Sequence, residues 1–286
     1  MNKKRILIIG KNSYIGENIK KYLNPLFYEV SEFDIKNKVL VEKDLIGIDV
    51  VIHVAAIVHQ KKIKDYTKYE DVNVKLPLEI AKLAKKNSIK QFIFLSSMSV
   101  YGVGKSLKGN IIDENTKCNP KTLYGRSKYE AEESLRLIES SNFKVSIIRP
   151  ANVYGKNCRG NYITTFLKIV KLFPVLPDVY DNVKQGMIYV DNLCELIKIV
   201  IDTNSSGIFP AQDIKGVSSL EIMQAICSKK KLKKRSSKFL GRIFLILRIP
   251  PVTKLFGGVV YDEKYAINKI KNYQKVNFID GINKSI

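Results

Sequence analysis

Tyr124 and Lys128 belong to the segment of this sequence with the clearest chemical potential, Tyr-Gly-Arg-Ser-Lys at the start of a predicted helix. A spacing of four residues places the phenol and the ammonium on one helix face. A tyrosine ordinarily titrates at about 10, and a nearby Lys ammonium together with a cationic nicotinamide lowers that pKa by favouring the phenolate. Such a tyrosine can exchange a proton with a sugar hydroxyl while hydride moves to or from a cofactor. Ser97, at the end of a predicted strand, could hydrogen-bond to the same oxygen.

A glycine-containing turn directly after the first predicted strand indicates a phosphate-binding loop. Gly10 permits a sharp turn that brings backbone N–H groups close to a pyrophosphate, and Gly16 permits close packing of helix on strand. Asp34 ends the second predicted strand, where a carboxylate can accept hydrogen bonds from an adenosine ribose. This favours NAD over NADP, although Lys36 and Lys38 could instead hold a 2′-phosphate.

These residues must be positioned by alternating strands and helices, which the hydrophobic pattern predicts over the first three quarters of the chain. The expected strands are Arg5–Ile9, Phe27–Phe33, Asp49–Val54, Gln91–Ser96, Lys144–Arg149 and Gly207–Pro210, and the expected helices are Tyr14–Leu23, Val72–Lys86, Tyr124–Ser141 and Asp191–Asp202. Strands that are apolar throughout and separated by helices indicate a parallel sheet covered on both faces. The predicted fold class is therefore α/β, a Rossmann-type doubly wound parallel sheet with a smaller C-terminal lobe.

The same pattern predicts the domain organisation. Residues 1–155, with 186–213 returning to them, are expected to form the dinucleotide-binding domain. Residues 156–185 and 214–286 break the alternation and are expected to build a substrate-binding lobe. In doubly wound sheets, ligands bind at the carboxyl ends of the strands, over which such late segments lie.

Composition limits the remaining possibilities. Of the 286 residues, 45% are hydrophobic, which is enough for a sizeable core, and the formal net charge is +22. The cysteines, Cys118, Cys158, Cys194 and Cys227, lack metal-ligand spacing, so no metal is expected. The first apolar run, Ile6–Ile9, is too short for a signal-peptide core, and we expect a cytoplasmic protein.

Seven sequence blocks occur in the same order as in a known family. The blocks are GKNSYIG (10–16), DVVIHVAA (49–56), DVNVKLPLEIAKLAKK (71–86), FIFLSSMSVYG (92–102), YGRSK (124–128), IIRPANVYG (147–155) and MIYVDNLCELI (187–197). Together they resemble the extended short-chain dehydrogenase/reductases, the NAD-dependent epimerase/dehydratase group that acts on nucleotide sugars.

This resemblance implies a set of site residues. The catalytic triad would be Ser97, Tyr124 and Lys128, with Lys128 also holding the nicotinamide ribose. The residues expected around NAD or NADP are Gly10, Ser13, Tyr14, Ile15, Gly16, Asp34, Ala55, Ala56, Asn73, Tyr124 and Lys128. Those expected to contact the nucleotide sugar are Ser97, Ser99, Asn152, Asn161 and Lys184. Homodimers built from paired helices are also common in the family.

The sequence departs from the family pattern at two of these places. Ser13 replaces the middle glycine of the phosphate loop, which leaves the backbone slightly less room beside a pyrophosphate. Gln185 stands where the family often has a phosphate-binding arginine, with Lys184 as a possible substitute. A lysine there would act as a point charge rather than as a bidentate fork.

Met98 and Ser99 reduce the number of family reactions that this chain could catalyse. The family's 4,6-dehydratases carry an Asp-Glu pair after the Ser or Thr, and its decarboxylases carry a Glu at the second position, so neither reaction is expected here. Reduction of a 4-keto sugar and 4-epimerisation remain, because the triad can run both unaided. The short chain favours reduction, and residues 156–177 and 254–265 resemble the compact 4-keto-6-deoxy-N-acetylhexosamine reductases of surface polysaccharide pathways. The expected substrate is UDP-N-acetylhexosamine or its 4-keto-6-deoxy form. A UDP-sugar 4-epimerase that retains NAD is the alternative.

A more distant alternative is a noncatalytic Rossmann-type protein that binds nucleic acid or a membrane surface. Residues 214–286 hold 16 Lys and Arg against 4 Asp and Glu, including the run Lys229–Arg235. The run is most simply a solvated helix end, and no nucleic acid is expected, since such a protein would not need the triad. The basic and apolar segment Lys238–Lys254 is expected to pack in the substrate lobe, with peripheral contact to an anionic inner membrane as a second hypothesis.

Overall fold

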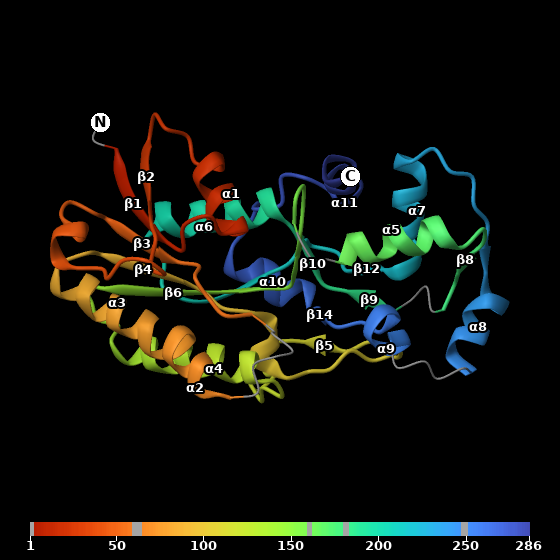
Figure 1. The fold of residues 1–286 in the computed structure, drawn as a ribbon, viewed down its shortest axis with the longest axis horizontal. Helices are drawn as coiled ribbons and strands as arrows, with labels where there is room; N and C mark the ends of the chain where they lie inside the picture. The colour runs from red at the N-terminus through yellow and green to blue at the C-terminus, as the bar shows by residue number, and fades with distance from the viewer. Residues whose placement is uncertain (1–2, 59–64, 159–161, 180–182, 247–250) are drawn as a thin grey trace. The chain divides into compact units, whose positions relative to one another are not determined.

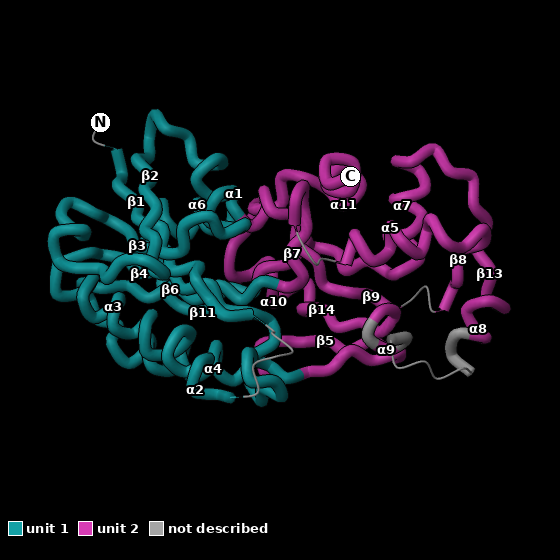
Figure 2. The backbone as a smooth tube through the Cα atoms, viewed as in Figure 1, with its two compact units in different colours: residues 1–102, 117–150, 194–210 teal, residues 103–116, 151–193, 211–286 magenta. Residues whose placement is uncertain are grey.

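The computed structural model describes residues 3–58, 65–158, 162–179, 183–246 and 251–286. The chain divides into two compact units, shown in separate colours in Figure 2. Unit 1 comprises residues 1–102, 117–150 and 194–210, and unit 2 comprises residues 103–116, 151–193 and 211–286.

Unit 1 is built on a six-stranded sheet with the order β11-β6-β4-β3-β1-β2 (Figure 1). The strands are β1 (Lys4–Ile9), β2 (Tyr28–Phe33), β3 (Val50–His53), β4 (Gln91–Leu95), β6 (Lys144–Pro150) and β11 (Gly207–Ala211). The pairs β1/β2, β1/β3, β3/β4 and β4/β6 are all parallel. This architecture confirms the predicted α/β class with a Rossmann-type sheet.

Helices cover both faces of this sheet, as fully buried strands such as β3 and β4 require. They are α1 (Tyr14–Tyr22), α2 (Thr67–Glu70), α3 (Leu76–Lys86), α4 (Leu123–Leu137) and α6 (Val190–Thr203). In Figure 1, α3 and α4 run along one face and α1 and α6 along the other. The apolar side of α3 and α4 meets Phe92 and Phe94 of β4 in one buried cluster.

The sheet order places the candidate site. The chain leaves β1 towards β2 on one side and returns to β3 on the other, so the order reverses between β1 and β3. The carboxyl ends of strands at such a switch point diverge and form a ligand crevice. Gly10 follows β1 there, and Ala55 and Ala56 follow β3.

Unit 2 contains short strand pairs and small helices. Its pairs are β7 (Asn152–Tyr154) with β10 (Met187–Tyr189), β9 (Lys184–Gln185) with β12 (Val217–Ser218), β8 (Leu176–Pro177) with β13 (Ser236–Ser237), and β5 (Ile111–Ile112) with β14 (Val260–Tyr261). Its helices are α5 (Tyr162–Leu172), α7 (Ser219–Lys229), α8 (Lys238–Ile246), α9 (Pro251–Phe256), α10 (Glu263–Lys269) and α11 (Phe278–Ser285), in addition to the start of α6. None of the helices, within the described ranges, is long and apolar enough to cross a membrane.

Candidate functional site

The turn after β1 has the geometry that a dinucleotide requires. Gly10 has a φ of +123°, and a Cβ built on it would lie 3.0 Å from the backbone nitrogen of Ala55. A side chain there would therefore be strained and would crowd the next strand end. Ser13 caps α1 by accepting a hydrogen bond from the Gly16 N–H at 3.2 Å. The amides of Tyr14 and Ile15 belong to the first turn, whose N–H groups lack intrahelical acceptors and are suited to an anion.

Asp34 lies at the edge of a pocket at the carboxyl end of β2. The pocket has a volume of about 610 Å³, and it is lined by Lys11, Glu32, Phe33, Asp34, Lys38, Val39, Val41, Lys43 and Asp44. The Asp34 carboxylate accepts hydrogen bonds from Asn37 Nδ2 at 2.9 Å and from the Lys36 N–H at 3.2 Å. The Asn37 bond is the main cause that holds the pKa of Asp34 below its usual value. The carboxylate is thus ionised beside a space that suits an adenosine, which fits a dinucleotide.

Asn73 fixes the backbone that follows β3. It lies in a π-helical turn, Asp71–Lys75, and is fully buried. Its Oδ1 accepts from the Ile57 N–H at 2.8 Å, and its Nδ2 donates to the Ile57 carbonyl at 2.9 Å and to Ser127 Oγ at 3.0 Å. In this structure Asn73 therefore positions the segment that contains Ala55 and Ala56 against helix α4.

Ser97, Tyr124 and Lys128 come together where β4 ends and α4 begins. A hydrogen bond joins the Tyr124 hydroxyl to the Ser97 side chain. Lys128 is buried, and its Nζ donates to the Leu95 carbonyl at 2.7 Å and lies 4.3 Å from the centre of the Phe94 ring. The i, i+4 spacing thus directs both α4 side chains to the end of the same strand, as expected from the sequence.

The pKa values at this cluster differ from the expectation. Burial raises the pKa of Tyr124 to about 12, and only the Ser97 hydrogen bond opposes the rise. Burial also lowers the pKa of Lys128 to about 7, while Glu132 acts to raise it. The ammonium is directed to the Leu95 carbonyl and not to the phenol, so Lys128 does not supply the lowering of the Tyr124 pKa that the spacing suggested.

A buried charge network behind this cluster was missed in the sequence analysis. Glu132 accepts hydrogen bonds from Arg149 Nε at 3.1 Å and from Ser96 Oγ, and it is paired with the Arg149 guanidinium. Arg149 Nη1 also donates to the Tyr101 hydroxyl at 2.8 Å. A signal was available, because Glu132 stands four residues after Lys128 and eight after Tyr124 on the same helix face.

The network completes three contacts between α4 and the end of β4. Tyr124 meets Ser97, Lys128 meets the Leu95 carbonyl, and Glu132 meets Ser96. Three successive residues of the strand end are therefore matched by three residues at helical spacing. These contacts tie α4 to the end of β4.

The residues expected to contact a substrate lie in different parts of the structure and form different hydrogen bonds. Ser99 Oγ donates to Ser97 Oγ at 3.0 Å, next to the triad. In unit 2, Asn152 Nδ2 donates to the Gly186 carbonyl at 2.8 Å. Asn161 lies outside the described residues. Their roles in substrate binding stay predictions.

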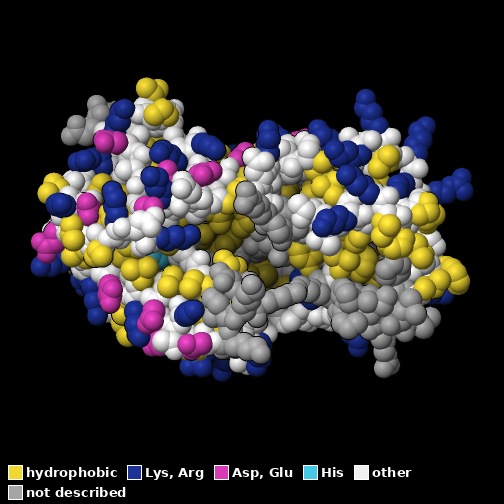
Figure 3. Space-filling model, in the orientation of Figure 1, with side chains coloured by type: hydrophobic (Ala, Val, Ile, Leu, Met, Phe, Trp, Pro, Cys, Tyr) yellow, Lys and Arg dark blue, Asp and Glu magenta, His cyan; other side chains and the backbone are white. Residues whose placement is uncertain are grey.

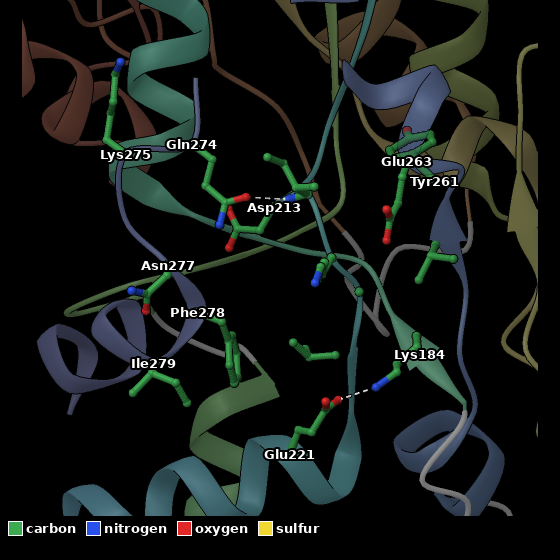
Figure 4. A pocket seen from close by; sticks show the side chains of 15 residues that line it. Lys184, Asp213, Glu221, Tyr261, Glu263, Gln274, Lys275, Asn277, Phe278 and Ile279 are labelled. Atoms are coloured by element: carbon green, nitrogen blue, oxygen red, sulfur yellow. Dashed lines mark hydrogen bonds and ion pairs between the residues drawn. The ribbon is translucent and has the colours of Figure 1, made fainter. Parts of the chain in front are cut away.

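Lys184 and Gln185 are successive residues of β9, so their side chains point to opposite sides. Gln185 is buried, and its Nε2 donates to Ser219 Oγ at 3.0 Å. Lys184 forms an ion pair with Glu221 at 2.7 Å at the edge of a pocket of about 800 Å³ in unit 2 (Figure 4). The two side chains therefore have different surroundings, and the phosphate contact expected of Lys184 stays a prediction.

Asp213 borders the same pocket and supports the local structure of unit 2. It accepts hydrogen bonds from Asn192 Nδ2 at 2.7 Å and from the Tyr154 hydroxyl at 3.1 Å. Burial raises the pKa of Asp213 to about 6, against the effect of these donors. No group of three His, Cys, Asp or Glu side chains is placed to hold a metal ion within the described ranges.

The fold and the site define the class of protein: it is an α/β protein with a Rossmann-type sheet and a Ser-Tyr-Lys cluster at the strand ends of that sheet. The model of the NAD dependent epimerase/dehydratase family matches residues 6–209. The chain belongs to this family, as the sequence blocks predicted.

Individual relatives agree with this assignment. The chain is 30% identical over 248 residues to a UDP-glucose 4-epimerase of Vibrio cholerae, covering 78% of this chain and 75% of the relative. It is 25% identical over 290 residues to the N-acetyl-alpha-D-glucosaminyl-diphospho-ditrans,octacis-undecaprenol 4-epimerase of Escherichia coli O157:H7, covering 93% and 83%. The fold resembles that of a UDP-glucuronic acid 4-epimerase from Bacillus cereus solved with NAD, with a TM-score of 0.75, 19% identity, and coverage of 98% and 95%.

Proposed function

We propose that this protein is an NAD-dependent 4-epimerase of a nucleotide sugar, with a UDP-hexose or UDP-N-acetylhexosamine as the substrate class. The observation that carries the proposal is the Ser97–Tyr124 hydrogen bond beside the buried Lys128, in a chain of the epimerase/dehydratase family. Met98 and Ser99 provide no acid or base for dehydration, so the cluster is suited to chemistry at one carbinol carbon.

Each residue has a defined role in this proposal. Tyr124 takes the proton from the C4 hydroxyl and returns it after the new configuration is set. Ser97 donates a hydrogen bond to the same sugar oxygen and orients it. Lys128 holds the nicotinamide ribose and contributes a positive charge at the strand end. The nicotinamide, when bound, supplies the hydride acceptor and donor at C4. Gly10, Ser13 and the first turn of α1 would hold its pyrophosphate, with Asp34 at the adenosine ribose.

Tyr124 needs a lower pKa than its burial gives it if it is to act as a base near neutral pH. The Ser97 hydrogen bond acts in this direction. Burial lowers the pKa of Lys128 to about 7, so the positive charge that it presents to the nicotinamide ribose is lost as the pH rises through about 7. We therefore expect turnover to depend strongly on pH through both groups.

The choice of epimerase over reductase rests on the relatives. The sequence favours a 4-keto reductase through its short chain, and that preference stays untested. The two curated relatives described above are both named as 4-epimerases, which supports epimerisation more strongly. The reactions differ in how the cofactor is handled, because an epimerase regenerates its NAD in every cycle and a reductase must exchange it.

A second candidate concerns the carrier of the sugar. The Escherichia coli relative is named for a sugar attached through a diphosphate to a polyprenol, and the match covers 93% of this chain. A diphosphate-linked N-acetylhexosamine on a lipid presents the same C4 hydroxyl and the same anionic linkage as a nucleotide sugar. We keep this as the alternative substrate class. A homodimer and a cytoplasmic location stay predictions.

Two measurements test the proposal. Denatured protein should release about one NAD per chain, and the folded protein should interconvert the C4 epimers of UDP-glucose or UDP-N-acetylglucosamine without added cofactor. An empty protein that oxidises NADH or NADPH with a 4-keto sugar would instead establish the reductase. Conversion of only the polyprenol-linked sugar would select the lipid carrier.

A further inference from the structure

The C-terminal part of unit 2 contains a long stretch without acidic residues. From Ile222 to Tyr261 there are ten Lys and Arg and no Asp or Glu. Cations at the end of a helix are favourable to its dipole, which accounts for Lys229 and Lys230 at the end of α7. The helix dipole does not account for the cations between α7 and β13 or for those in α8.

These cations lie on ordered elements that are joined to each other. The Lys234 ammonium donates to the carbonyls of Val170 and Phe173 at the end of α5, the latter at 2.6 Å. Strand β13 pairs in parallel with β8, with Ser236 opposite Leu176. The ends of α5 and α7 and the start of α8 therefore form one continuous edge of unit 2.

We define the basic edge by its exposed residues, which are Lys171, Leu172, Lys229, Lys230, Lys231, Leu232, Lys233, Arg235, Lys238, Phe239 and Arg242. Glu221 lies in the first turn of α7, where it is paired with Lys184, and Asp178 is buried. On the face drawn in Figure 3, this end of unit 2 carries dark blue and yellow side chains together, without magenta acids on the described residues shown there.

Large apolar side chains stand among the cations. Phe239 is 74% exposed and Leu172 is 75% exposed, and Leu232 is also exposed. A surface for nucleic acid uses cations with aromatic stacking, but it gains nothing from exposed leucines. A surface for lipid uses both, since cations meet anionic headgroups while Phe and Leu enter the boundary of the acyl chains.

We propose that the basic edge docks unit 2 on a membrane surface rich in anionic lipid. Lys229, Lys230 and Lys231 lie at the headgroups, and Phe239 and Leu172 enter the interfacial layer. Attraction to anionic lipid contributes about 1 kcal/mol per Lys or Arg near the surface, or roughly a fivefold change in partitioning. The basic edge belongs to unit 2, and the residues expected to hold the dinucleotide belong to unit 1, so the proposal does not depend on the reaction.

Cosedimentation with vesicles tests the proposal on the full chain. Vesicles of phosphatidylcholine with 30% phosphatidylglycerol should bind the protein, pure phosphatidylcholine should not, and 0.5 M NaCl should release it. Changing Lys229, Lys230 and Lys231 together to Gln should lower partitioning about 100-fold, as three fivefold effects multiply. The matched control changes the exposed Lys82, Lys90 and Lys117 of unit 1 to Gln, which removes the same charge and should lower partitioning less than fivefold.

A second pair of variants tests the apolar contribution. Phe239→Ser should lower vesicle binding about tenfold at unchanged charge, whereas Phe27→Ser, at a 58% exposed residue of unit 1, should not. Circular dichroism checks that all variants are folded. Equal losses in the two lysine triples would overturn the proposal in favour of nonspecific net charge. Tight, salt-sensitive binding of single-stranded RNA without vesicle binding would overturn it in favour of nucleic acid.

Discussion

Glu132→Gln gives the most informative perturbation of the network behind the candidate site. Glu132 is fully buried and Arg149 is nearly so, and the two are joined by a short ion pair and further hydrogen bonds. Gln keeps the size of the side chain but removes its charge. The Arg149 guanidinium cannot lose its proton, so it would remain buried, charged and without its counter-ion.

The expected loss follows from this geometry. Removing one partner of a buried ion pair costs about 3–5 kcal/mol of the free energy of unfolding. Arg149→Met should cost a similar amount, because it leaves the Glu132 carboxylate buried without its counter-ion. The double variant should lose only about 1–2 kcal/mol, since replacing both charges removes the desolvation penalty along with the attraction. The coupling energy between the two sites should therefore be at least about 2 kcal/mol.

Urea unfolding followed by circular dichroism provides the assay, because the chain has no tryptophan for fluorescence. The four proteins of the cycle are compared at pH 7.5. Additive losses in the double variant, or a loss below about 1 kcal/mol for Glu132→Gln, would refute the assigned network. The same substitution should also lower the pKa of Lys128 below about 7, because Glu132 is the charge that raises it.

Three further predictions concern separate residues. Gly10→Ala should weaken dinucleotide binding at least about tenfold in calorimetry, because its φ is +123° and its Cβ would lie 3.0 Å from a backbone nitrogen, whereas Gly104→Ala, with open space around it, should not. Burial lowers the pKa of His53 to about 3, whereas the unfolded chain takes up a proton on this residue below a pH of about 6.5. The free energy of unfolding should therefore decrease as the pH is lowered from about 6.5 towards 3. In urea titrations, His53→Leu should make this decrease smaller by about 1.4 kcal/mol per pH unit. Asp34→Ser should shift the ratio of NADH to NADPH affinity at least about tenfold towards NADPH, since it removes an ionised acceptor; an unchanged ratio would place the ribose elsewhere.

The sheet and its main helices could be predicted closely, because their signals are local. Expected strand Gln91–Ser96 is β4 (Gln91–Leu95), and expected helix Asp191–Asp202 is α6 (Val190–Thr203). Both follow from continuous apolar runs and helical periodicity. Helix α4 ends at Leu137 rather than Ser141, because the backbones of Ser140 and Phe143 pair in a bridge before β6.

The expected helix over residues 72–86 contains a π-helical turn that hydrophobic periodicity does not predict. Its start is a π-helical turn, Asp71–Lys75, and α3 proper begins at Leu76. The widened turn carries the buried Asn73, whose bonds to Ile57 and Ser127 join segments that are 16 and 54 residues away. Hydrogen bonds between residues so far apart in the chain cannot be predicted from a single sequence.

At the candidate site, too, the sequence predicted which residues share a helix face but not their contacts. Helical spacing predicted that Tyr124 and Lys128 share a face, and the structure brings Ser97 to Tyr124. The spacing did not predict that Lys128 donates to the Leu95 carbonyl or that its pKa falls to about 7. Burial decides both, and burial depends on how α4 packs on β4.

Turnover of Tyr124→Phe, measured together with its NAD content, tests the central claim most directly. Phe keeps the ring but removes the hydroxyl that is bonded to Ser97. We expect kcat for C4 epimerisation to fall about 10²- to 10⁴-fold, while the variant retains the NAD content of the unmodified protein. Turnover within about threefold of the unmodified protein, with NAD still bound, would contradict the role of Tyr124 as the acid and base.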